Sequence, residues 1–307
     1  MQIRRDFLST VLLVIVVTGC ARQPTRGPVQ VDASPGQKPV TPAAAETTMP
    51  NRADSLKFAI LGDFGTASRG QLEMAAEMAR VRQRFPFEFV ITVGDNLYGS
   101  ERPQDFVRKF EAPYKPLLDA GVKFYASLGN HDGREQAHYK LFNMDGKLYH
   151  SFKPAKQNVR FFVLETTSLD PDQVAWIQKE LEGSREDWKI PYFHHPPYSS
   201  GGRHGSHGAI RDVLEPLFVK YNVSVVFNGH DHFYERVKPQ QGIVYFVTGA
   251  GGQLRNGNID RSSGLTAKGF DTDYSFMIAE INGDEMFFNA IARTGAVVDS
   301  GVITRRK

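Results

Sequence analysis

Residues 89–98 have the sequence Phe-Val-Ile-Thr-Val-Gly-Asp-Asn-Leu-Tyr, in which a short apolar run ends directly in glycine and aspartate. An apolar run of this length is typical of a buried β-strand. Because ligands of α/β folds bind beyond the carboxyl ends of strands, such runs predict one shared site. Four further runs end in residues of metal-ligand types, at 58–63 (Phe-Ala-Ile-Leu-Gly-Asp), 125–132 (Tyr-Ala-Ser-Leu-Gly-Asn-His-Asp), 191–195 (Pro-Tyr-Phe-His-His) and 225–232 (Val-Val-Phe-Asn-Gly-His-Asp-His).

From Leu56 to the C-terminus, short apolar runs alternate with amphipathic segments, which indicates a single α/β domain over 56–307. Side chains alternate between the two faces of a strand, so the strand-like run at 191–194 places His194 and His195 on opposite faces. We expect His195 to face the site and His194 to point away, into packing or a hydrogen bond. The amphipathic segments predict helices at 69–84, 103–119, 171–182 and 208–221.

The composition suits one globular domain with tails, since 41% of the 307 residues are hydrophobic and 23% are charged. A formal charge of +3 gives no electrostatic reason to expect a nucleic-acid partner. Six of the nine histidines lie between residues 194 and 232, which indicates metal or proton chemistry. Cys20 is the only cysteine, which excludes an intrachain disulfide and a thiolate metal site.

The N-terminal segment predicts an export signal over residues 1–20. Arg4 and Arg5 precede an apolar run at 11–17, and Thr-Gly-Cys20 follows as a small-residue cleavage pattern. Residues 17–20 resemble a bacterial lipobox, which implies a lipid on Cys20 and a periplasmic or outer-surface location in the cell envelope. The alternative is an incidental cysteine. The two arginines suit either an ordinary or a twin-arginine export signal.

Residues 21–55 combine six prolines with Ala, Thr, Gln and Gly, which predicts a disordered tether. The apolar run at 11–17 is too short to span the ~30 Å hydrocarbon core of a bilayer. We therefore expect membrane association only through the lipid on Cys20. The oligomeric state stays open.

Taken together, the five clusters resemble the calcineurin-like metallophosphoesterases, and among them the purple acid phosphatases of the small tartrate-resistant type. That family has the motifs Asp-x-Gly, Gly-Asp-x-x-Tyr, Gly-Asn-His-Asp/Glu, an isolated His and Gly-His-x-His. The resemblance implies an α/β fold with four layers, an α/β/β/α sandwich of two mixed sheets. The matching segments here are 63–65, 94–98, 129–132, His195 and 229–232.

The resemblance also implies two metal ions and their ligands. A phenolate and two carboxylates suit ferric iron, whereas an amide and two imidazoles suit a divalent ion such as Fe²⁺, Zn²⁺ or Mn²⁺. Most of the superfamily has a histidine where Gly65 stands and lacks a tyrosine ligand such as Tyr98. The alternative for Tyr98 is an aromatic loop residue that packs on the domain. The implied ligands are Asp63, Tyr98 and His232 for the ferric ion, Asn130, His195 and His230 for the divalent ion, and Asp95 as the bridge.

For catalysis, the resemblance implies in-line attack on phosphorus by a hydroxide, formed from a water whose pKa the metals lower. His131 is then the leaving-group acid or a phosphate contact, and Asp132 is a candidate to orient its ring. His204 matches a second active-site histidine, although a solvated loop residue is its alternative, as it is for His207. The expected activity is hydrolysis of phosphomonoesters. The alternatives are a phosphodiesterase or nucleotidase of the same fold, and a non-catalytic, metal-containing surface binding protein.

Overall fold

The computed structural model describes residues 48–307 and contains two mixed β-sheets. Parallel strands form one end of the first sheet and the centre of the second. The first sheet has the order β13-β12-β11-β1-β2-β3 and contains β1 (Leu56–Leu61), β2 (Phe89–Val93), β3 (Lys123–Ser127), β11 (Ser275–Asn282), β12 (Glu285–Ala292) and β13 (Val297–Thr304). The second has the order β10-β8-β9-β7-β6-β5-β4 and contains β4 (His150–Phe152), β5 (Val159–Val163), β6 (Trp188–Tyr192), β7 (Val225–Asn228), β8 (Tyr234–Val237), β9 (Val244–Thr248) and β10 (Thr266–Phe270).

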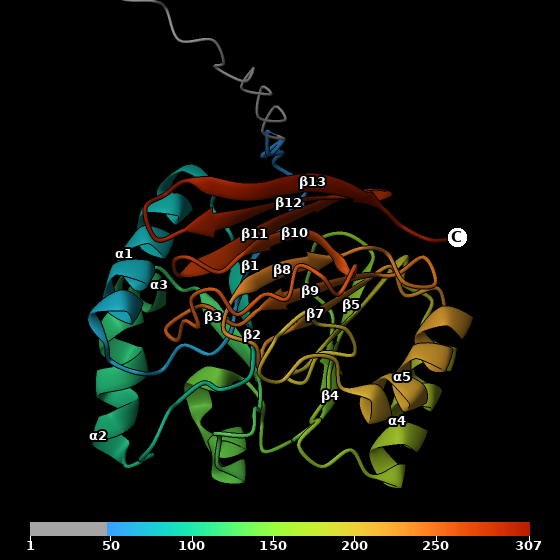
Figure 1. The fold of residues 1–307 in the computed structure, drawn as a ribbon, viewed down its shortest axis with the longest axis horizontal. Helices are drawn as coiled ribbons and strands as arrows, with labels where there is room; N and C mark the ends of the chain where they lie inside the picture. The colour runs from blue at the N-terminus through green and yellow to red at the C-terminus, as the bar shows by residue number, and fades with distance from the viewer. Residues whose placement is uncertain (1–47) are drawn as a thin grey trace, which may run out of the picture. The chain divides into compact units, whose positions relative to one another are not determined.

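Helices cover the outer face of each sheet, which produces four layers (Figure 1). The predicted four-layer α/β/β/α sandwich is therefore confirmed. One predicted helix, 103–119, is divided by a π-helical turn. The first sheet is covered by α1 (Arg69–Arg84), α2 (Pro103–Phe106), the π-turn η1 (Val107–Glu111) and α3 (Ala112–Asp119), and the second by α4 (Pro171–Gly183) and α5 (Gly208–Lys220); the 3₁₀ turns η2 (Arg134–His138) and η3 (Lys140–Phe142) follow β3.

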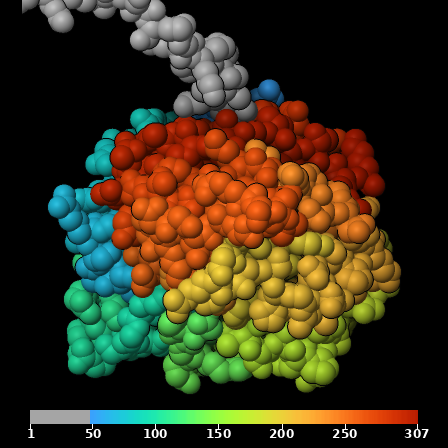
Figure 2. All heavy atoms as spheres, viewed as in Figure 1, coloured from blue at the N-terminus to red at the C-terminus, as the bar shows by residue number. Residues whose placement is uncertain are grey.

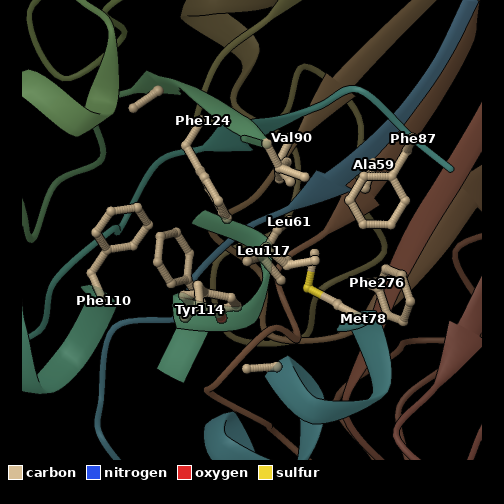
Figure 3. Packing of buried hydrophobic residues seen from close by; sticks show 14 of the residues in the cluster. Ala59, Leu61, Met78, Phe87, Val90, Phe110, Tyr114, Leu117, Phe124 and Phe276 are labelled. Carbon is tan, nitrogen blue, oxygen red and sulfur yellow. The ribbon is translucent and has the colours of Figure 1, made fainter. Parts of the chain in front are cut away.

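Alternation along the strands separates the core into layers. In β1, Phe58 and Ile60 pack between the sheets, while Ala59 and Leu61 pack under α1 and α3. Figure 3 shows this second layer, in which Phe276 of β11 also takes part. Burial of one large apolar side chain contributes about 1.5–3 kcal/mol, so these layers supply much of the free energy of folding.

The same alternation applies to β6. Tyr192 packs between the sheets, and Phe193 packs outward toward α4 and α5. His194 therefore continues on the face of Tyr192, toward the first sheet, and its Nδ1 lies 2.9 Å from the carbonyl oxygen of Val93. The prediction that His194 points away from the site is wrong, because the site lies between the two sheets rather than on the outer face of one.

The parallel strands bring the predicted clusters to one edge. Strands β1, β2 and β3 run parallel, and so do β5, β6, β7 and β9. The carboxyl ends of each set consequently point the same way. The C-terminal part of the chain, orange to red, covers the upper part of the face seen in Figure 2.

The folded region begins before Leu56. The buried carboxylate of Glu280 accepts hydrogen bonds from Asn51 N, Arg52 N and Ser55 Oγ, at 2.6, 2.7 and 2.6 Å. Residues 51–55, which the sequence assigned to the tether, thus belong to the folded domain. The predicted signal at 1–20, Cys20 and residues 21–47 of the tether lie outside the described residues. Within 48–307, no helix has the length and apolar character needed to cross a bilayer.

Candidate metal centre

The loops that follow β1, β2 and β7 hold three site residues in a left-handed backbone conformation. Asp63, Asp95 and His230 have φ angles of 54°, 51° and 73°. Residues other than glycine rarely adopt this conformation, and it is concentrated at functional sites. Hydrogen bonds between loops maintain it, because Asp63 N donates to Gly94 O at 3.0 Å and His230 N donates to Asp63 Oδ2 at 3.0 Å. The second contact ties one sheet to the other.

Three side chains surround the phenol of Tyr98 and form the first donor set together with it. The Tyr98 hydroxyl oxygen lies 3.2 Å from Asp63 Oδ1, 3.0 Å from Asp95 Oδ2 and 3.2 Å from His232 Nε2. His232 Nε2 is 3.4 Å from Asp63 Oδ1. This set joins the residues that the sequence assigned to the ferric site.

A second donor set surrounds His194 Nε2. This nitrogen lies 3.0 Å from Asn130 Oδ1, 3.1 Å from His230 Nδ1 and 3.4 Å from Asp95 Oδ1. One oxygen of Asp95 therefore faces each set, as the predicted bridging position requires.

The geometry of both sets fits a bound cation. Ligand atoms about 2.0–2.2 Å from one ion lie about 3.0–3.4 Å from one another in octahedral or tetrahedral arrangements, which is the spacing found here. Within residues 48–307, neither Asp63 nor Asp95 forms an ion pair with a lysine or arginine. Among the described residues, only histidines therefore lie within ion-pair distance of these buried carboxylates.

The electrostatics of the donor sets also favour a cation. Burial, followed by the neighbouring Asp95 carboxylate, raises the pKa of Asp63 well above its usual value. Burial and the charges of Asp63 and Asp95 raise the pKa of the Tyr98 phenol, so this side chain ionises only with a positive charge beside it. Burial lowers the pKa of His230 to about 2 and that of His232 to about 3, which keeps their lone pairs available for a metal.

His195 lies beside the centre, with a ligand atom within 4.8 Å of those of His194 and His230, and its other contact is with Thr166. Its Nδ1 is 3.0 Å from Thr166 Oγ1, and its ring centroid is 4.5 Å from that of His230 and 5.3 Å from that of His207. Burial, and then His194, lower its pKa to about 3. His194 rather than His195 touches Asn130, so we propose below that it takes the ligand position that the sequence assigned to His195.

The segment 130–132 contributes residues with separate tasks. His131 N donates to Asp95 Oδ1 at 2.9 Å, and its exposed ring lies 4.8 Å from the ring of Tyr98. The Asp132 carboxylate accepts hydrogen bonds from backbone N–H groups of Gly129, Asn96 and Leu97 at 2.9–3.0 Å. Among the described residues no hydrogen bond joins Asp132 to His131. Asp132 therefore holds the loop of Asp95 and does not orient the His131 ring as predicted.

The loop after β6 brings His204 to the centre. The sequence had not decided between this position and a solvated loop residue. The ring centroid of His204 lies 4.2 Å from that of His230. Asp231 Oδ2 holds the loop by accepting from Ser199 Oγ at 2.6 Å and Gly205 N at 3.1 Å. Asp231 was not among the predicted site residues, although it lies between two predicted ligands, His230 and His232.

The sequence profile of the calcineurin-like phosphoesterases matches residues 56–234, which is more than half of the 307 residues. The chain belongs to this family. The phosphoesterase is 28% identical to tartrate-resistant acid phosphatase type 5 of Oryctolagus cuniculus over 238 residues, 64% of this chain and 73% of the relative. It is 27% identical to purple acid phosphatase 17 of Arabidopsis thaliana over 243 residues, 67% and 71% of the two chains.

Solved structures share the fold of this phosphoesterase. GAP50, the anchor in the inner membrane complex of Plasmodium, superposes with a TM-score of 0.71 at 19% identity, over 82% of this chain and 90% of its own. A purple acid phosphatase from yellow lupin (Lupinus luteus) seeds superposes with a TM-score of 0.69 at 20% identity, over 83% and 55% of the two chains. Family and relatives together identify the protein as a hydrolase similar to purple acid phosphatases, with residues suited to a dinuclear metal site.

Backbone contacts hold Tyr98 of the phosphoesterase in the first donor set. Tyr98 N donates to Gly65 O at 2.9 Å. The buried ammonium of Lys109, on the π-turn η1, donates to Tyr98 O at 2.7 Å and Ser100 O at 2.6 Å. A Cβ at position 65 would lie 1.9 Å from Asn96 O, so this backbone leaves no room for a side chain at that position.

Gly65→Ala is accordingly expected to destabilise the protein by about 1–3 kcal/mol, the usual effect of overpacking a tight site. The contact with Asn96 O forces apart the two loops that carry Asp63 and Asp95. Urea unfolding measures the loss, and Gly183→Ala is the matched control because nothing lies within 4 Å of the added Cβ at the end of α4. Equal stabilities of the two variants would contradict the close contact.

Proposed function

We propose that the protein hydrolyses phosphomonoesters with two metal ions, and that His194 takes the ligand position assigned to His195. Two donor sets that share the two oxygens of Asp95 carry this proposal. Ferric iron suits the set with the phenol, and a divalent ion (Fe²⁺, Zn²⁺ or Mn²⁺) suits the set with the amide and imidazoles. The proposed sites are Asp63, Asp95, Tyr98 and His232 for the ferric ion, and Asp95, Asn130, His194 and His230 for the divalent ion.

Once bound, such a metal pair supplies an activated water nucleophile and stabilises charge on the phosphoryl oxygens. The chain supplies the remaining chemistry. His131 has an exposed ring at the edge of the first donor set and is suited to give a proton to the departing alkoxide. His204, beside His230, is placed to contact the phosphate from the opposite sheet.

A substrate panel tests the proposal. The purified protein with both metals bound is expected to hydrolyse phosphomonoesters faster than phosphodiesters. A higher kcat/KM for diesters would favour the phosphodiesterase alternative, and preference for nucleotides alone would favour a nucleotidase. No hydrolysis of any ester with both metals bound would favour a non-catalytic surface binding protein.

His131→Ala is expected to lower kcat by about 100-fold with both metals retained, because it removes a general acid without removing a ligand. Metal content is measured by elemental analysis and kcat by steady-state kinetics on the same preparation. His138→Ala, an exposed imidazole on η2, is the matched control and is expected to leave both unchanged. Loss of metal from the His131 variant would show that His131 is a ligand instead.

The ferric assignment has a spectroscopic test. A phenolate on ferric iron absorbs visible light, so we expect a coloured protein whose band disappears in Tyr98→Phe. A colourless protein that contains two zinc or two manganese ions would overturn the assignment to iron.

We further propose that the protein is exported and attached to the cell envelope through a lipid on Cys20, as the lipobox-like residues 17–20 suggest. Cys20→Ser is expected to move the protein from the membrane fraction to the soluble fraction. A Cys20→Ser protein that still partitions with membranes would contradict the lipid anchor.

A further inference from the structure

A cavity of about 670 Å³ lies between the start of the second sheet and α4, outside the residues discussed so far. His150 of β4 lines it and is paired in register with Val163, the last residue of β5. Strand β5 runs parallel to β6, which precedes His194. The cavity thus lies two strands from β6, about 10 Å along the sheet, on the side of the second sheet that α4 covers, whereas the metal centre lies between the two sheets.

Arg134 connects the cavity to the centre. It follows His131 by three residues, and it lines both this cavity and a smaller one of about 90 Å³ bordered by Gly129, Asp132 and Glu165. A group held at the centre through its phosphate can therefore extend past Arg134 into the larger cavity.

An aromatic pair forms one wall. The rings of Tyr149 and Trp176 have centroids 5.1 Å apart and an interplanar angle of 50°, and both side chains are only partly buried. Because the two rings are tilted and in contact, a substrate ring cannot insert between them. Their outer faces offer a surface on which a third ring can stack. Stacking on such a surface tolerates many planar groups.

The charges of the cavity favour an anion. Arg134 and Lys147 are exposed, and within residues 48–307 neither forms an ion pair. The two acidic side chains already have partners: Glu180 accepts from Ser151 Oγ at 2.9 Å and lies 3.4 Å from Arg160, and Asp170 caps the start of α4 through Gln173 N. Arg134 and Lys147 thus carry positive charge that no carboxylate of the cavity pairs with.

His150 does not add to this charge. Both its ring nitrogens are buried without a hydrogen-bond partner among the described residues. Burial, and then Lys147, lower its pKa to about 4, so the ring is neutral at pH 7. Selection for an anion consequently rests on Arg134 and Lys147.

We propose that this cavity binds the leaving group of the substrate and selects alcohols that carry both a planar ring and a second anionic group. The ring stacks on Tyr149 and Trp176, and the anion binds Arg134 and Lys147. The inference rests on the proposed phosphomonoesterase activity and specifies its substrate class. An aryl phosphate with a carboxylate and a nucleoside bisphosphate share this chemistry.

The experiment compares kcat/KM of the metal-loaded full chain for four monoesters. O-Phosphotyrosine and adenosine 3′,5′-bisphosphate carry ring and anion, phenyl phosphate carries the ring alone, and glycerol 2-phosphate carries neither. Trp176→Ala is expected to lower kcat/KM about 10-fold for the three ring substrates, and Lys147→Ala about 5-fold for the two with the second anion. Both variants are expected to hydrolyse glycerol 2-phosphate as the wild type does. The control is Lys179→Ala, an exposed lysine of α4 outside the cavity.

The outcomes separate the two proposals. Equal losses for all four esters, or no loss for any, would overturn the binding site while the phosphatase activity stands. If the variants lose more kcat/KM for O-phosphotyrosine than for adenosine 3′,5′-bisphosphate, the cavity prefers an aryl phosphate with a carboxylate. The opposite order would indicate a nucleoside bisphosphate. If no monoester is hydrolysed with both metals bound, the proposed function fails.

A binding measurement remains informative even then. The chain has two tryptophans, and Trp188 is fully buried, so quenching of fluorescence by O-sulfotyrosine reports on Trp176. We expect quenching in the wild type and a several-fold weaker Kd in Lys147→Ala. Absence of quenching in the wild type would overturn the binding site independently of catalysis.

Discussion

Asp95→Asn is expected to lower phosphomonoester hydrolysis by at least about 1000-fold, since it removes the one carboxylate shared by both donor sets. Asp95 Oδ2 faces Tyr98 and Oδ1 faces His194, so a neutral amide weakens both sites at once. We expect the content of both metals to fall, measured by elemental analysis after dialysis. The control is Asp119→Asn, an exposed carboxylate whose partner is Lys115 on the same helix.

The stability of the same variant provides an independent check on misfolding. Without metals, burial and the Asp95 charge raise the pKa of Asp63, so ionisation of Asp63 above pH 4 destabilises the folded state. Replacing the Asp95 carboxylate with a neutral amide reduces the destabilisation caused by ionised Asp63. At pH 7 with a chelator, Asp95→Asn is therefore expected to unfold at the same or a higher temperature than the wild type. A variant that keeps both ions in full amount would contradict the bridging role.

His194→Ala is expected to remove the divalent ion and to lower activity by at least about 100-fold, whereas His195→Ala is expected to keep both ions and to lose no more than about 10-fold. His194 Nε2 contacts Asn130, His230 and Asp95, all members of the second set. The Nδ1 of His195 contacts only Thr166, so its loss disturbs a neighbour of the site.

Metal content and kinetics of the two variants decide between the histidines. His194 is fully buried, so His194→Gln, which fills more of the space than alanine, controls for a cavity in the core. If His195→Ala loses the divalent ion while His194→Ala keeps it, the assignment from the sequence was right and the revision is wrong.

Much of the site was predictable because its residues follow strands with a strong local pattern. Apolar runs such as 89–93 form buried strands, and the residues just beyond them lie at the sheet edge whatever the details of packing. Strands β4, β8, β10 and β13 were not predicted. The segments 150–152, 234–237 and 266–270 are short, and most residues of 297–304 are only partly buried or exposed. The π-turn at 107–111 was also missed, because its sequence continues the helical pattern on both sides.

The sequence by itself determined the α/β class, the positions of most strands along the chain and most of the donor residues, because period-two alternation and strand-terminal glycines act locally. Only the tertiary structure decided which histidine faces the centre and which partners Asp132 binds. Alternation places His194 and His195 on opposite faces, but it does not say which face meets the other sheet. That choice depends on packing between strands more than a hundred residues apart, as the contact of His194 with Val93 shows.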